Sequence, residues 1–120
     1  MIIALWIVNA ILALVFLAAG ATKLSRSRAA LAASGMAWTA DASDGAVKAV
    51  GAVEVLGAIG LIAPLATGIA PVLAPLAAAG LALTMVGAVV VHVRRGESAV
   101  AAAALLVVAA ASAVLGFLTV

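Results

Sequence analysis

Four long apolar runs dominate the chain, and short polar segments separate them. The runs cover about 2–21, 45–65, 71–92 and 98–120. Each is close to the ~20 residues that a helix needs to cross the ~30 Å hydrocarbon core of a bilayer. Only helices and closed barrels satisfy their backbone groups in lipid, and continuous apolar runs of this length indicate helices. The pattern predicts an all-α membrane protein in which residues 1–120 form a single four-transmembrane-helix bundle.

The residues at the ends of the runs agree with this prediction. Ser43 and Asp44 can cap the start of the second helix, and Ser98 can cap the fourth. Pro71 suits the first turn of the third helix, where its missing N–H costs nothing. Gly96 is typical of a helix C-terminus. The first run lacks the positive segment of a secretory signal, so we expect it to be a retained span.

The longest segment between two runs, 22–44, has two interpretations. Basic and apolar residues alternate within 25–38 at roughly helical spacing. An interfacial helix would rest Leu31 and Trp38 on the membrane surface and keep Arg28 in water. The alternative is an ordinary loop, and the sequence does not decide between them.

Composition supports a membrane protein and excludes several classes of site. Hydrophobic residues make up 69% of the chain and the mean hydropathy is +1.47, whereas soluble domains are only about half apolar. Cysteine is absent, so no disulfide or thiolate metal site can form. One histidine cannot provide two ligands to a haem. No metal cluster is expected.

The basic residues all lie near two of the loops, which predicts the orientation of the chain. They are Lys23, Arg26, Arg28, Lys48, Arg94 and Arg95. The segment 64–71 carries no charge. By the positive-inside rule, we expect a multi-pass protein of the cytoplasmic membrane with both termini outside. Cations confined to short loops do not indicate a nucleic-acid partner, although the net charge is +2.

Glu54 is the first candidate for a functional residue, because it is the lone carboxylate within the second run. An acid inside a span costs about 2.5–3.5 kcal/mol on insertion scales and is by default a functional-site hypothesis. Gly51 and Gly57 share its helix face, which predicts close contact with another helix. The alternative is a structural role, in which the carboxyl group ties helices together.

Three polar side chains can reach the same interior. Thr84 lies about 12 Å into the third helix and Glu54 about 15 Å into the second, so the two can meet. Lys23 and His92 end the first and third helices and can face the cytoplasmic mouth. If Lys23 turns inward, it is the natural ion partner of Glu54. Alternatively Glu54 is protonated, because burial disfavours its charged form.

Gly80 belongs to a ladder of small residues on the third helix, with Thr84 and Ala88, that is typical of helix packing. Four short helices with narrow packing faces would be stabilised by contact with helices of another subunit. We therefore expect a homo-oligomer or a complex with other membrane subunits.

Three segments together resemble the DoxX-like family of small four-helix membrane proteins. They are 14–24 (LVFLAAGATKL), 48–64 (KAVGAVEVLGAIGLIAP) and 83–97 (LTMVGAVVVHVRRGE). The positions that match are Lys23, Lys48, Gly51, Glu54, His92 and Glu97. The resemblance implies a bundle in the cytoplasmic membrane, and these residues, with Thr84, become candidates for contact with a ligand or partner.

The resemblance and the residues leave three functions open. The first is an accessory or scaffold subunit of a membrane complex, redox-linked or linked to oxidative stress as in relatives, and not catalytic alone. The second is a quinone-linked oxidoreductase component, in which Glu54 with Lys23 or His92 handles the proton and quinone is the cofactor. The third is a proton-coupled transporter, which the one-sided charge and the 3% aromatic content make the weakest of the three.

Overall fold

The structure, a computed structural model, describes residues 1–120 and contains helices but no strands. Its long helices are α1 (Ile2–Ser25), α3 (Asp44–Thr67), α4 (Leu73–Arg94) and α5 (Val100–Thr119). A short helix α2 (Arg28–Ala33) and a 3-10 helix η1 (Ala37–Asp41) connect α1 to α3. All four long helices are long and apolar enough to cross a membrane. The prediction of an all-α four-helix membrane bundle is therefore confirmed.

The helix ends follow local backbone chemistry. Ser43 caps α3, because its hydroxyl accepts a hydrogen bond of 3.1 Å from the amide of Ala46. Gly68 and Gly96 follow the ends of α3 and α4 with φ of 70° and 69°, the left-handed conformation that glycine adopts most easily. Pro71 lies in the turn before α4, so that helix begins slightly later than its apolar run.

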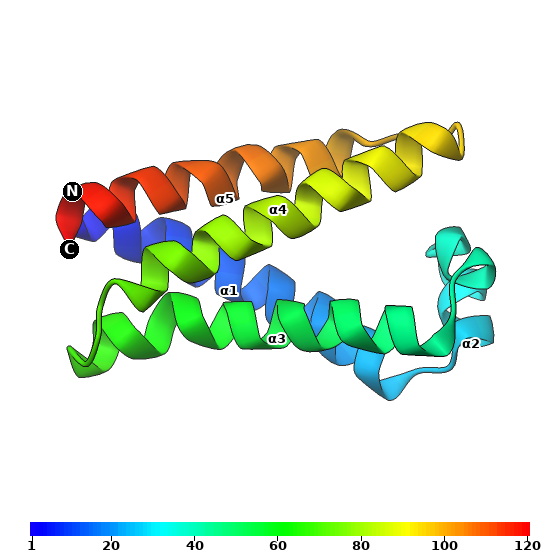
Figure 1. Cartoon of the computed structure of the whole chain (residues 1–120), viewed down its shortest axis with the longest axis horizontal. Coiled ribbons are helices and arrows are strands. Elements are labelled where there is room, and N and C mark those ends of the chain that lie inside the picture. The colour runs from blue at the N-terminus through cyan, green and yellow to red at the C-terminus, as the bar shows by residue number, and fades with distance from the viewer.

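The four long helices form a ring made of two pairs, α1 with α3 and α4 with α5 (Figure 1). Contacts of α3 with α4 and of α1 with α5 join the pairs. Both chain termini lie at one end of the bundle, which we call the terminal end. The other end, which we call the charged end, carries α2, η1 and the basic residues. Figure 1 shows the two pairs close together at the terminal end and diverging toward the charged end.

Burial along α4 reflects this divergence. Its fully buried residues all lie between Ala74 and Met85, in the part nearer the terminal end. Beyond Met85, the same face of α4 is only partly buried, at Ala88 and His92. The buried face of α3 instead runs from Val47 to Pro64. The core is therefore continuous along the α1–α3 pair and incomplete between the pairs at the charged end.

Glycine permits the close approach of α1 and α3. A Cβ added to Gly20 would lie 2.6 Å from the Gly51 carbonyl oxygen, and one added to Gly51 would lie 2.9 Å from the Lys23 Cβ. A Cβ at Gly57 would meet Leu81 of α4 at 2.6 Å. Gly51 and Gly57 thus lie at helix contacts. Gly80 does not, because no atom lies within 4 Å of the position its Cβ would take.

A buried polar network joins three helices near the terminal end. The Asn9 amide donates to the Leu61 carbonyl oxygen at 2.9 Å, and the Ser112 hydroxyl donates to Asn9 Oδ1 at 2.5 Å. Asn9 and Ser112 are both buried. Because lipid offers no hydrogen bonds, these contacts hold α1, α3 and α5 in one register.

We expect Gly20→Ala to destabilise the bundle by about 1–3 kcal/mol, because the added methyl group would overlap backbone atoms of α3 that cannot move without shifting the helix. Gly80→Ala is the matched control and should leave stability unchanged or slightly higher. Equilibrium unfolding in mixed detergent micelles measures both. Equal effects of the two substitutions would contradict the close α1–α3 contact.

Candidate functional site

Lys23 and Glu54 form a buried ion pair between α1 and α3. Lys23 Nζ lies 2.6 Å from Glu54 Oε1. The exposed fractions are 7% for Lys23 and 2% for Glu54, which are low for charged residues. The structure therefore brings together two of the predicted site residues, in the arrangement expected if Lys23 turns inward.

The pair follows from the positions of both residues in their helices. Lys23 lies in the last turn of α1, where a cation is favourable near the C-terminal carbonyls. Glu54 is on the buried face of α3, one turn from Gly51, whose missing side chain leaves room for Lys23. The distance between Lys23 Nζ and Glu54 Oε1 is that of an ion pair, but the angles at this contact are not those of a hydrogen bond, and Glu54 Oε1 has no other hydrogen-bond partner. This carboxylate oxygen can therefore still accept a proton or a hydrogen bond.

Thr84 does not join this pair. Its hydroxyl donates to the Gly80 carbonyl oxygen of its own helix at 2.9 Å. The neighbouring Met85 instead occupies the buried face of α4. Thr84 was expected to meet Glu54 because the two residues lie at similar depth in the membrane. Depth does not determine which side of the helix a residue lies on, because successive side chains are rotated by about 100° about the helix axis.

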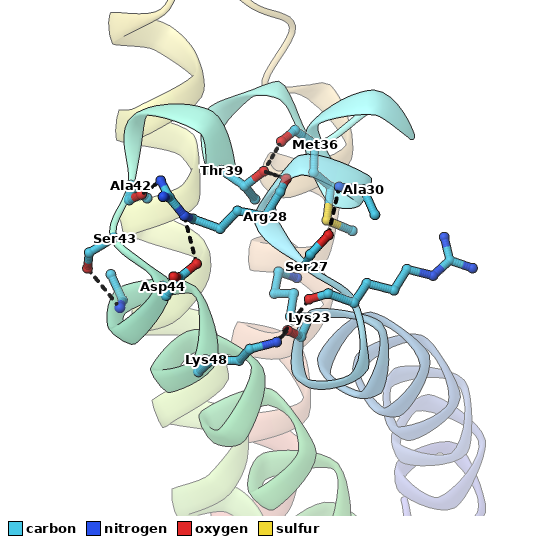
Figure 2. A network of polar contacts seen from close by, with 12 residues as sticks. Lys23, Ser27, Arg28, Ala30, Met36, Thr39, Ala42, Ser43, Asp44 and Lys48 are labelled. Atoms are coloured by element: carbon cyan, nitrogen blue, oxygen red, sulfur yellow. Dashed lines mark hydrogen bonds and ion pairs between the residues drawn. The ribbon is translucent and has the colours of Figure 1, made fainter.

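Lys48 closes the C-terminal end of α1. Its ammonium group donates to the carbonyl oxygens of Lys23, Leu24 and Arg26, at 2.8, 2.9 and 2.9 Å (Figure 2). These are among the carbonyls that a helix end leaves without partners. All three N–H groups of Lys48 are occupied, so the residue acts here as a helix cap supplied by α3.

His92 and Glu97 lie at the charged end and not beside Glu54. His92 Nδ1 and Arg95 Nε each lie 3.1 Å from Glu97 Oε1. Arg95 also forms an ion pair with Asp41 of η1. The hydrogen bond with His92, helped by the charge of Arg95, lowers the pKa of Glu97 below its ordinary value of 4.5. Glu97 is therefore a carboxylate at neutral pH and holds the Arg95 guanidinium in place.

The connection between α1 and α3 folds over the charged end as a cap (Figure 2). Arg28 contacts Asp44 Oδ1 at 2.7 Å and donates to the Ala42 carbonyl oxygen. The Thr39 hydroxyl donates to the Met36 carbonyl oxygen at 2.8 Å. Leu31 is fully buried, so it packs inside this cap and does not rest on the membrane surface as an interfacial helix would require.

The charged side chains of this site can form ion pairs and exchange protons. No group of three or more His, Asp or Glu side chains is placed to hold a metal ion. The sequence did not reveal the Asp41–Arg95 pair or the role of Ser112. The one available signal for Ser112 was that it is the only polar side chain between residues 99 and 119.

The fold and the buried pair define a class: a four-helix integral membrane protein with an intramembrane acid neutralised by a lysine. The model of the DoxX-like family matches residues 7–115. The chain belongs to the DoxX-like family, which confirms the resemblance. No curated protein and no solved structure matches the chain.

We expect Lys23→Met to cost up to about 3–5 kcal/mol, because it leaves a buried carboxyl group without its partner. The double variant Lys23→Met/Glu54→Leu should recover most of that loss, since both charges are then absent. Unfolding in mixed micelles reports the difference. Arg94→Met, at an exposed cation that forms no ion pair, is the control. A double variant as unstable as the single one would show that the two residues are not energetically coupled.

The contacts of Glu97 should depend on pH in one direction only. A lowered pKa means that the stabilisation is fully present above the ordinary value of 4.5 and is lost as pH falls through the lowered value. We expect the Glu97 carboxyl group to take up its proton, and its contacts to weaken, only below 4.5. Carbon NMR of the Glu97 carboxyl group measures this titration directly, with Glu97→Gln to assign the signal. A midpoint above 4.5 would contradict the contacts described.

Proposed function

We propose that this DoxX-like membrane protein is a non-catalytic accessory or scaffold subunit of a membrane complex. One observation carries the proposal: the polar side chains within the spans are engaged inside the chain. Glu54 faces Lys23, and Asn9 contacts Ser112. The hydroxyl groups of Thr22, Thr67, Thr84 and Thr119 each donate to a carbonyl oxygen of their own helix. Such an interior supports a scaffold whose recognition surface lies on the outside.

An exposed groove between α3 and α4 supplies a surface for a partner helix. It encloses about 310 Å³ and is lined by Val53, Leu56, Gly57, Ala77, Gly80 and Leu81. Helices in lipid associate where small residues let the backbones approach. A Cβ at Gly80 would meet no atom of the other helices within 4 Å, so the space beside Gly80 is available to a helix of another subunit.

The proposed orientation places the charged end in the cytoplasm. All six basic residues lie at this end or in the adjacent helix turns, whereas the loop between α3 and α4 carries no charge. The positive-inside rule then places both termini outside the cytoplasmic membrane. A homo-oligomer or a complex with other subunits would both use the same outer helix faces.

We expect Gly80→Leu to remove the partner without unfolding the bundle, because Leu at this position fills only the groove. Native mass spectrometry after mild extraction from the host membrane measures the partner subunits. Ala110→Leu, on the exposed face of α5, is the matched control. Partner subunits retained by Gly80→Leu, or a protein that carries only lipid, would contradict docking in this groove.

A quinone-linked component is the second candidate function, and Glu54 Oε1 is the observation that favours it. This oxygen is buried, lies beside a lysine and lacks a well-formed hydrogen bond, so it could exchange a proton with a ligand. An apolar groove of about 520 Å³ between α1 and α3 begins at Ala58, one turn from Glu54, and suits an isoprenoid tail. Solvent extraction and mass spectrometry of the purified protein test for a quinone. Its absence would remove this candidate, as would equal quinone content in Glu54→Gln.

A further inference from the structure

The two helix pairs are joined unequally at their ends. Only two side-chain polar contacts connect the α1–α3 pair, with its cap, to the α4–α5 pair. Ser112 contacts Asn9 near the terminal end, and Arg95 contacts Asp41 at the charged end. The first is buried among packed side chains, whereas 71% of the Asp41 side chain is exposed.

Packing also differs between the two ends. Near the terminal end, Gly57 and Gly60 of α3 closely approach α4. At the charged end, Ala88 and His92, which continue the buried face of α4, are only partly buried. A hinge at the terminal end would therefore let the pairs separate at the charged end while disturbing few apolar contacts.

We propose that the Asp41–Arg95 ion pair is a latch that holds the two helix pairs together at the charged end and thereby limits access of water and solutes to the partly buried face of α4 at Ala88. The cap carries one half of the latch, because Asp41 is the last residue of η1. Arg95, which directly follows α4, carries the other half, and Glu97 also contacts its guanidinium group. The proposal does not depend on which partner or ligand the protein serves.

The strength of this contact suits a reversible device. A partly exposed ion pair adds little free energy and is weakened by salt. Opening therefore needs only a modest perturbation at the charged end, such as an anion that competes for Arg95. By contrast, the buried Lys23–Glu54 pair remains intact when the latch opens, because both of its residues belong to the α1–α3 pair.

The absence of cysteine allows a direct test. A single cysteine introduced by Ala88→Cys, on the partly buried face of α4, reports opening through its rate of labelling by a water-soluble methanethiosulfonate in lipid nanodiscs. We expect Arg95→Gln to accelerate labelling about two- to five-fold, the range that an exposed ion pair supports. Arg94→Gln is the matched control and should leave the rate unchanged, because Arg94 forms no ion pair. Raising the salt concentration should accelerate labelling of the parent protein but not of Arg95→Gln.

The charge-swapped variant Asp41→Arg/Arg95→Asp separates a latch from a loss of folding. It is made together with Glu97→Gln, so that the new aspartate does not face the Glu97 carboxylate. Slow labelling restored by the swap would support the proposal, and a thermal unfolding midpoint close to that of the parent would show that the fold is kept. Equal rates in Arg95→Gln and the parent would overturn the latch. Fast labelling in the swapped variant, or in Arg94→Gln, would overturn it as well, because opening would then not follow the pairing of these two charges.

Discussion

The contact between α1 and α3 at Gly20 and Gly51 determines the arrangement of the charged residues. Two helices whose backbones approach this closely exclude both lipid and water from the seam between them, and they bring Lys23 within ion-pair distance of Glu54. A carboxylate at this depth would otherwise be costly in a bilayer. The close contact offsets the cost of an acid inside a span, because it brings the opposite charge of Lys23 from the neighbouring helix. Lys48 strengthens the same seam, since it caps α1 from α3.

The rest of the bundle is organised around this continuous pair. Packing between the pairs is dense near the terminal end, where Leu81 and Gly57 meet, and it thins toward the charged end. Buried polar contacts follow the same gradient, because the Asn9–Ser112 contact lies in the dense part and the exposed Asp41–Arg95 pair lies in the thin part. The two helix pairs are therefore held together more firmly near the terminal end than at the charged end.

The fold could be predicted from the sequence because its strongest signal is four apolar runs of the length that a helix needs to cross a bilayer. This signal can be interpreted without knowing how the helices pack. The sequence also identified Glu54, since an acid within a span stands out, and it offered Lys23 as the partner if that side chain turns inward. It failed for the contact between Thr84 and Glu54, because spacing along one helix does not give its rotation relative to the others. The Asp41–Arg95 pair could not be predicted either, since it depends on how the cap folds over the charged end.

The Asn9–Ser112 contact has a consequence for the order in which the protein is made. Asn9 belongs to α1, which is synthesised before the other three long helices, and Ser112 belongs to α5, which is synthesised after them. Until α5 enters the membrane, the side-chain oxygen of Asn9 lacks its donor, although the amide group can already reach Leu61 once α3 is present. The polar contact is therefore completed only when all four long helices have been inserted. A chain interrupted before α5 would leave this oxygen unsatisfied within the bilayer, at a cost that the finished bundle does not bear.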